Sequence, residues 1–340
     1  MLSRRSFLKL SIPLIFNLLK FPLSTSLDTG AKDITSSTEV LFPLIGNRSE
    51  PQPFIKNYYA INILEDNELP YAKSSPLPLD YEYPHDENGV LIFVYKENTY
   101  YHPVAIAQLT LMFLESYRLS GNLEYWDKAD IHLNKLLDIS VKSDNARYFP
   151  YGFDFALHGI PEDTLIAPWY SGMAQGQALS AFVRAYKLRG VTEYLTASEE
   201  IFRSFTQYLG NSNPWTVFID DRGYYWIEEY PYIERTQALN GFIFGIYGLY
   251  DYYIILKDLL AFELCQAAIT TVQEYIYTYR VSGGVSYYCQ RHKQQIPKYH
   301  IIHTQQLFML YKITQADFFR TAGDGSISNR NRVTLFRHLK

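Results

Sequence analysis

Residues 172–188 read GMAQGQALSAFVRAYKL, and their apolar residues recur at the i, i+3, i+4 and i+7 positions of a helix. Gly190 follows as a natural C-cap, and a second helical run at residues 193–208 comes after a short turn. This stretch predicts a helical hairpin. Such a hairpin buries its apolar face only by packing against a neighbour, so we expect further hairpins in the chain.

The same pattern recurs at intervals of 67, 65 and 65 residues, marked by a polar residue in each repeat: Gln108, Gln175, Asn240 and Gln305. These residues belong to four helical runs: 104–119, 172–188, 237–256 and 300–313. Each run is followed by a second one, at 124–137, 193–208, 259–277 and, weakly, near residue 317. The repeat predicts a mainly α fold, an (α/α) toroid of about four helical hairpins over residues 101–321, with the first helices as the inner ring.

Three linkers, at residues 148–168, 217–235 and 282–299, are rich in Tyr and turn signals and contain β-like stretches. They predict short β-hairpin loops that bring aromatic side chains to the N-termini of the inner helices, where a polymer-binding cleft would lie. Residues 28–100 contain one strand-like run at 89–95 and predict an extended N-terminal arm with a β-hairpin. Residues 322–340 predict a loose tail.

The N-terminus resembles an export signal. Residues 3–9 read SRRSFLK, which is typical of a twin-arginine export signal, and a short apolar stretch follows at residues 10–19. Residues 1–27 are therefore predicted to direct the chain to the periplasm or outside the cell. Because no A-x-A cleavage site is present, an uncleaved membrane anchor stays open, and no other membrane association is expected.

Composition limits the possible partners. The formal net charge of −4 argues against a nucleic-acid binder. The 31 tyrosines suit a sugar-binding cleft, although a Tyr-rich core explains them as well. Cys265 and Cys289 form no disulfide framework, but a single bridge between them remains possible in an oxidising compartment. No dinucleotide- or phosphate-binding glycine motif occurs, so no cofactor is predicted, and a homodimer stays open.

The second linker ends in Glu228-Glu229-Tyr230-Pro231. A carboxylate buried beside aromatic rings would have a raised pKa and could act as a general base, whereas a solvated pair would have no such role. Pro231 predicts an extended backbone at Tyr230, so that Glu229 and Tyr230 would point in opposite directions.

The third linker supplies the other candidates. Arg291 could bind a substrate carboxylate with its planar guanidinium, or it could form a surface ion pair. Tyr299 and His300 precede the fourth hairpin, with His303 one turn further on. Tyr299 needs a nearby cation to act near neutral pH, and the candidates are Arg291, and His300 or His303 if protonated. No Asp, Glu or Cys joins these histidines at metal-ligand spacing, so no metal site is predicted.

Together, these segments resemble the D-glucuronyl C5-epimerase family. The block APWYSGMAQGQA at residues 167–178 is similar to the family's W-Y-S-x-M-A-Q-G-Q-A, and residues 228–231, 239–242 and 248–251 are similar to its E-E-Y-P…L-N-G-F…G-L-Y-D. Three more segments resemble its Y-x-x-R-H, Y-H-x-x-H and Y-x-P-x-x-I-A-Q motifs: residues 288–292, 299–303 and 101–108. The matches are ordered and run from about residue 100 to 310.

The resemblance implies a role for each matched residue. It implies four catalytic residues, the acid/base groups and their neighbours: Glu229, Tyr230, Tyr288 and Tyr299. It places Arg291 at the uronate carboxylate. Four further matched residues are expected to bind substrate: Tyr101, Gln175, Asn240 and His300. The animal enzymes carry a β-sandwich before the W-Y-S block, for which the roughly 60 residues between Gln108 and Trp169 leave no room.

The resulting hypothesis is an epimerase that inverts C5 of D-glucuronate to L-iduronate, or of a related hexuronate, within a polysaccharide. C5 is α to a carboxylate, which takes up the charge when the C5 proton leaves, and an acid on the opposite face of the ring returns a proton. The export signal argues against heparan as the native polymer. Two alternatives stay open: a polysaccharide lyase that begins with the same deprotonation, and a non-catalytic glycan-binding envelope protein.

Overall fold

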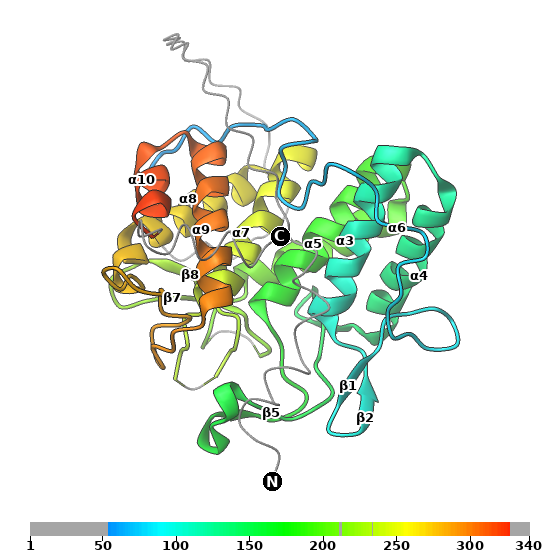
Figure 1. Cartoon of the computed structure of the whole chain (residues 1–340), viewed down its shortest axis with the longest axis horizontal. Coiled ribbons are helices and arrows are strands. Elements are labelled where there is room, and N and C mark those ends of the chain that lie inside the picture. Colours follow the sequence, from blue (N-terminus) through cyan, green and yellow to red (C-terminus); the bar gives the residue numbers. More distant parts are fainter. Residues whose placement is uncertain (1–53, 211–212, 233, 327–340) are drawn as a thin grey trace.

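The computed structural model describes residues 54–210, 213–232 and 234–326 (Figure 1). Within these residues the chain folds into four consecutive helical hairpins. They pair α3 (Pro103–Ser120) with α4 (Leu123–Ile139), α5 (Gly172–Arg189) with α6 (Thr192–Arg203), α7 (Leu239–Leu256) with α8 (Leu259–Tyr275), and α9 (Pro297–Thr314) with α10 (Asp317–Ser326). The export signal predicted at residues 1–27 lies outside the described residues.

The inner row of the fold consists of the first helix of each hairpin. α5 packs against both α3 and α7, α7 packs against α9, and each second helix packs on its own partner. The approach of α5 to α7 depends on glycine: a Cβ on Gly176 would lie 2.5 Å from the Cα of Gly245, and a Cβ on Gly248 would lie 2.4 Å from the carbonyl oxygen of Gly176. The predicted (α/α) toroid architecture and its inner helices are thereby confirmed.

Local sequence explains where the helices begin and end. Pro103 occupies the first turn of α3, where a missing N–H costs nothing, and the side chain of His102 accepts a hydrogen bond from the amide of Ala105. Gly121 and Gly190 end α3 and α5 in the left-handed conformation, at φ of 69° and 67°. The predicted C-cap at Gly190 is therefore confirmed.

The four polar residues that mark the repeat do not occupy equivalent positions. Gln108 is the sixth residue of α3, Gln175 the fourth of α5, Asn240 the second of α7 and Gln305 the ninth of α9. The first three are buried, whereas Gln305 is partly exposed. The regular spacing thus reflects the length of a hairpin with its linker, not a repeated side-chain role.

The N-terminal arm crosses the C-terminal halves of the inner helices. Its backbone amides donate hydrogen bonds to α9, α7 and α3 in turn, through the pairs Asn62–Ile313, Leu64–Tyr250 and Lys73–Glu115. The carbonyl of Pro70 accepts from Arg184 of α5. In Figure 1 the first part of the arm, in blue, runs along the upper edge of the molecule, and the linkers between the helical hairpins extend toward the lower edge. The arm therefore covers the C-terminal ends of the inner helices, and the linkers lie at their N-terminal ends.

Among the described residues, four two-stranded antiparallel strand pairs occur, one in the N-terminal arm and three in the linkers between the helical hairpins. They are β1 (Phe93–Tyr95) with β2 (Asn98–Tyr100), β3 (Val141–Ser143) with β4 (Ala146–Tyr148), β5 (Phe155–Ala156) with β6 (Thr164–Leu165), and β7 (Val217–Ile219) with β8 (Tyr225–Ile227). In β7 and β8, Phe218 lies opposite Trp226. The third linker differs from the prediction, because its described residues form isolated bridges, such as Tyr287 with Gln295, in place of a strand pair.

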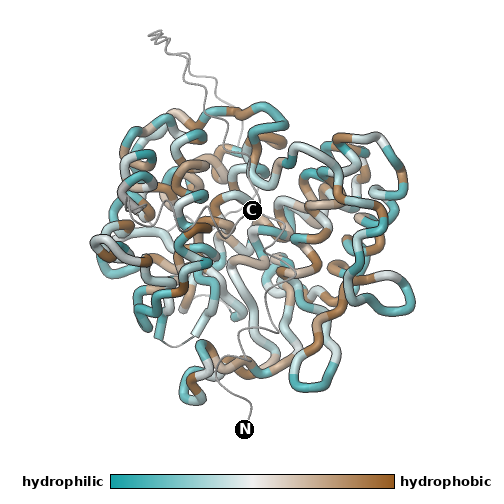
Figure 2. Tube along the Cα trace, in the orientation of Figure 1, coloured by the Kyte–Doolittle hydropathy of each residue, from teal (hydrophilic) through white to brown (hydrophobic). Residues whose placement is uncertain are grey.

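The core is apolar and extends to the last hairpin. α7 is long and apolar enough to cross a membrane, but 78% of its 18-residue window is buried inside the protein, so it serves as the central core helix. Figure 2 shows hydrophobic segments along the helices and hydrophilic ones in the peripheral turns. α10 continues to Ser326 with Phe319 and Ala322 buried, so the ordered chain runs past residue 321, where the sequence predicted a loose tail to begin.

Candidate active site

The linkers bring the four predicted catalytic residues together. The hydroxyl oxygens of Tyr230 and Tyr288 lie 3.0 Å apart and share a hydrogen bond. The ring centroids of Tyr288 and Tyr299 lie 4.4 Å apart. Burial, and after it the charge of Glu229, raises the pKa of all three phenols, so the Glu229 carboxylate lies within electrostatic reach of them. Residues 70 positions apart in the chain thus form one cluster at the N-terminal ends of α7 and α9.

Glu229 is the acidic centre of this cluster. It follows β8, is 6% exposed, and its Oε2 has no hydrogen-bond partner among the described residues. A Cβ on Gly241 would lie only 2.2 Å from Oε2, so the glycine at the start of α7 provides the space for the carboxylate. Burial raises the pKa of Glu229 to about 8, and the neighbouring hydroxyls of Tyr230 and Tyr288 offset this only in part.

Glu228 has a different role from Glu229. Its carboxylate accepts hydrogen bonds from the backbone amides of Thr236 and Gln237, at 3.1 and 3.0 Å, and from the Thr236 hydroxyl. Its own carbonyl accepts from the amide of Gly172, the first residue of α5. Glu228 therefore fastens the loop between β8 and α7, whereas Oε2 of Glu229 has no hydrogen-bond partner among the described residues.

The predicted opposite orientation of Glu229 and Tyr230 is wrong. The backbone bends at both residues instead of running extended into Pro231. Both side chains consequently belong to the same cluster. The sequence rule failed because Pro231 restricts the backbone of Tyr230 alone, whereas the carboxylate of Glu228 accepts from the Tyr230 amide and stabilises the bend.

The tyrosines of the cluster keep their phenolic protons at neutral pH. Burial, together with the charge of Glu229, raises the pKa of Tyr230, Tyr288 and Tyr299 above the ordinary phenol value. A protonated histidine at position 303 was expected to lower such a pKa. Burial instead lowers the pKa of His303 to about 3, so this imidazole is neutral, and the expectation is wrong.

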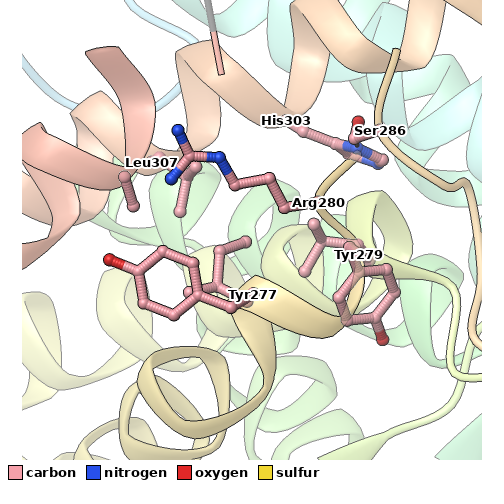
Figure 3. Close-up of a pocket in the computed structure, with 9 residues that line it drawn as sticks. Tyr277, Tyr279, Arg280, Ser286, His303 and Leu307 are labelled. Atoms are coloured by element: carbon pink, nitrogen blue, oxygen red, sulfur yellow. Dashed lines mark hydrogen bonds between the residues drawn. The ribbon is translucent and has the colours of Figure 1, made fainter. Parts of the chain in front are cut away.

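Ser286 holds the two histidines of α9. Its amide donates to Nδ1 of His300 at 3.1 Å, and its hydroxyl lies 2.9 Å from Nδ1 of His303. Ser286 and His303 line a small pocket of about 10 Å³ together with Tyr279 and Leu307 (Figure 3). That volume holds about one water molecule and no sugar ring. The hydrogen bond from Ser286 to His300 joins the third linker to α9, and the substrate-binding role expected of His300 stays a prediction.

Arg291, the predicted carboxylate ligand, forms two ion pairs. Its Nη2 lies 2.5 Å from Oδ1 of Asp163 and 3.0 Å from Oε2 of Glu234. Its Nη1 also donates to the carbonyl of Glu234 at 3.4 Å. The guanidinium therefore joins the first linker to the third, and its side chain remains 22% exposed.

The remaining predicted substrate-binding residues make internal contacts. The Tyr101 hydroxyl donates to Asp86 of the arm at 2.7 Å. The amide nitrogen of Gln175 donates to the Arg147 carbonyl and to the Ser204 hydroxyl, at 2.7 and 2.8 Å, and the residue is fully buried. The Asn240 side-chain oxygen is buried without a hydrogen-bond partner among the described residues, next to Gly241. Of these three residues, Asn240 alone is next in sequence to Gly241, the glycine that makes room for the Glu229 carboxylate.

The sequence predicted aromatic side chains at this end of the inner helices, but it did not show that those of the first linker form an aromatic wall beside this cluster. Tyr151 and Trp169 stack at 3.8 Å with an angle of 11° between their rings. Phe155 stacks on both Trp169 and Tyr230, at 5.9 and 6.1 Å. Phe155 and Tyr230 are only partly buried, so the wall continues from the core to solvent. The aromatic richness of residues 148–168 was the available signal, but the partners of each ring could not be read from it.

Cys265 and Cys289 are both buried, and both are free thiols, so the possible bridge between them does not form. Cys265 lies within α8. Cys289 lies in the third linker beside His158 and His292.

The fold and the cluster define a class: an α/α-toroid protein with a buried carboxylate among tyrosines at the N-terminal ends of its inner helices. The sequence profile of the family described as D-glucuronyl C5-epimerase C-terminus matches residues 142–324. This match covers more than half of the sequence, and the chain belongs to that family.

Individual relatives agree with this assignment over shorter stretches. A D-glucuronyl C5-epimerase of Caenorhabditis elegans is 36% identical over 94 residues, which are 27% of this chain and 15% of that protein. Among solved structures, the cellobiose 2-epimerase of Bacillus thermoamylovorans B4167 has a TM-score of 0.53 at 12% identity, covering 72% of this chain and 65% of that one. The cellobiose 2-epimerase of Spirochaeta thermophila DSM 6192 has a TM-score of 0.51 at 12% identity, covering 71% and 63%. These structures share the fold.

Proposed function

We propose that this protein is a uronate C5-epimerase that acts on a uronate-containing polysaccharide. The observation that carries the proposal is the buried Glu229 carboxylate, whose pKa of about 8 suits a general base, packed among three protonated tyrosines. Membership of the D-glucuronyl C5-epimerase family supports this choice of reaction.

The proposed mechanism needs two proton carriers on opposite faces of the sugar ring. Ionised Glu229 removes the C5 proton, and the electron pair of the C5–H bond moves into the sugar carboxylate to form an enediolate. The phenol of Tyr299 then donates its proton to C5 from the other face. The hydrogen bond between Tyr230 and Tyr288, next to both groups, offers a path by which the proton on Glu229 returns to the tyrosinate.

The enediolate needs a cation where its charge develops, and we propose Arg291 for this role. A guanidinium has five N–H donors. Both ion pairs of Arg291 run through Nη2, so other donors can meet a substrate carboxylate. Asp163 and Glu234 would hold the guanidinium in place until the substrate arrives.

The aromatic wall suggests how a polymer would bind. Sugar rings stack on aromatic faces, and the partly buried rings of Phe155 and Tyr230 adjoin the Glu229 cluster. We propose that this wall supports the sugar next to the reacting uronate. We also propose that the protein is exported, on the basis of the twin-arginine pattern at residues 3–9.

Incubation of the protein with a panel of glucuronate polysaccharides in D₂O, followed by proton NMR, tests the proposal. An epimerase incorporates deuterium at C5 and produces iduronate-type signals. A lyase would instead yield an unsaturated uronide that absorbs in the ultraviolet, and a binding protein would leave C5 protonated.

A pair of variants makes the test specific. Tyr299→Phe removes one buried hydroxyl from the cluster and should abolish epimerisation. Tyr58→Phe removes a hydroxyl from a residue that is 85% exposed and should leave it unchanged. If Tyr299→Phe retained wild-type turnover, the two-sided mechanism would be wrong.

A further inference from the structure

Three metal-ligand side chains meet where the first and third linkers touch. The Sγ of Cys289 lies 3.7 Å from Nε2 of His158 and 3.3 Å from Nδ1 of His292, and all three atoms lie within 4.8 Å of one another. Cys289 is fully buried, and both histidines are partly buried. In a tetrahedral zinc site with bonds of about 2.3 Å to sulfur and 2.0–2.1 Å to nitrogen, sulfur and nitrogen lie roughly 3.6 Å apart. The two observed sulfur–nitrogen separations bracket that distance.

The groups around these three side chains are those that support a metal site. The Nε2–H of His292 donates to Oδ2 of Asp163 at 2.7 Å, which turns the lone pair of Nδ1 toward Cys289. A carboxylate behind a ligating imidazole fixes its tautomer and orientation in this way. The backbone amide of His292 also donates to the Cys289 sulfur, at 3.4 Å.

The backbone also brings the three side chains into position. Cys289 and His292 are separated by two residues, a common spacing for zinc ligands. His158 adopts a left-handed conformation with φ of 56°, which is uncommon for a residue with a side chain. That conformation lies in the 3-10 turn Leu157–Gly159 and brings the imidazole to the cysteine across 131 positions of sequence.

We propose that His158, Cys289 and His292 bind a Zn²⁺ ion, with Asp163 orienting His292 and the fourth coordination position open. One thiolate and two imidazoles select zinc over Mg²⁺ or Ca²⁺, which prefer oxygen ligands. On binding, the Cys289 thiol loses its proton and its sulfur bonds to the metal. The sequence predicted no metal site because no ligand lies at the required spacing from His300 and His303. The proposed ligands lie elsewhere: Cys289 and His292 belong to the third linker, and His158 belongs to the first.

The ion would join the loop around His158 to the segment that carries Tyr288. The His158 and Tyr288 rings meet edge to face at 5.3 Å, so the metal would also restrain this tyrosine. The proposal concerns binding alone and does not depend on the proposed epimerase activity. It would stand if no uronan were turned over.

Cobalt substitution tests the site directly. The full chain, without an affinity tag, is stripped of metal with a chelator, dialysed and titrated with Co²⁺. One equivalent should produce a thiolate-to-cobalt charge-transfer band and the intense visible bands of tetrahedral Co²⁺, and Zn²⁺ should displace both. A wild-type chain that gives neither band overturns the proposal, whatever the variants do.

Matched variants locate the ion. Cys289→Ser should abolish the charge-transfer band, whereas Cys265→Ser, at the other buried thiol, should retain it. Asp163→Asn should keep the band but weaken metal affinity about 10- to 100-fold. If Cys289→Ser does not fold, His158→Asn on the partly buried turn provides the same test, and an unchanged spectrum in that variant would refute the ligand assignment.

Discussion

Replacement of Glu229 by Gln should make the protein more stable at alkaline pH while removing its proposed activity. The carboxyl has a pKa of about 8 when folded, against an ordinary value of 4.5. Between these values the unfolded chain ionises and the folded one stays protonated, so wild-type stability falls as pH rises. Each pH unit in that window costs about 1.4 kcal/mol. Gln cannot ionise, so Glu229→Gln escapes this cost.

The magnitude follows from the two pKa values. Little of the cost is present at pH 5, and nearly all of it is present at pH 9. The free energy of unfolding of Glu229→Gln minus that of the wild type should therefore increase by about 4 kcal/mol between pH 5 and pH 9. Urea unfolding followed by circular dichroism at both pH values measures this difference. Any fixed cost of burying the amide cancels between the two pH values.

A surface control separates this effect from general charge. Glu65 lies exposed on the arm, and Glu65→Gln should change the free energy of unfolding by less than about 0.5 kcal/mol at either pH. If the curves of Glu229→Gln and wild type run parallel, within about 1 kcal/mol, the carboxylate is not held in a desolvated site. The reasoning that makes Glu229 a general base would then fail.

Four more outcomes are expected. The kcat/KM for C5 exchange should rise with pH and level off above about 8, because Glu229 must be ionised to act as a base; a flat profile from pH 6 to 9 would exclude it. Arg291→Lys should lower kcat/KM for epimerisation by about tenfold or more, through loss of the planar fork, and unchanged kinetics would assign Arg291 to its ion pairs alone. Gly241→Ala should lower kcat sharply, because its Cβ would displace the Glu229 carboxylate; normal turnover would show that the carboxylate tolerates the shift. Asp251→Asn breaks a buried two-point ion pair with Arg184 and should cost about 3–5 kcal/mol in urea unfolding at pH 7, and a loss below about 1 kcal/mol would contradict the buried-pair argument.

Much of the fold could be predicted because its signals are local. The helical period, the C-cap at Gly190 and the hairpin length are all written in neighbouring residues. The contact of α5 with α7 was not predictable in the same way. Gly176 and Gly248 are small residues in two separate helices, and only their packing shows that each leaves room for the other.

The candidate site was predicted as a set of residues, and its chemistry came from the tertiary structure. Glu228 and Glu229 are adjacent residues of the same type. The Glu228 carboxylate accepts four hydrogen bonds and fastens a loop, whereas the Glu229 carboxylate is buried with one oxygen that has no partner among the described residues. Which carboxylate is suited to act as the proposed base depends on what each one contacts, and those contacts come from residues up to 70 positions away.

The sequence by itself determined the number of hairpins, their order and which linkers lie at the N-terminal ends of the inner helices, because helix formation and capping depend on neighbouring residues. Only the tertiary structure decided the ionisation of Glu229 and the neutrality of His303, because desolvation depends on everything packed around a group. It also decided that His158 reaches Cys289 across 131 residues, since a side-chain cluster of this kind exists only once the two linkers have been placed together.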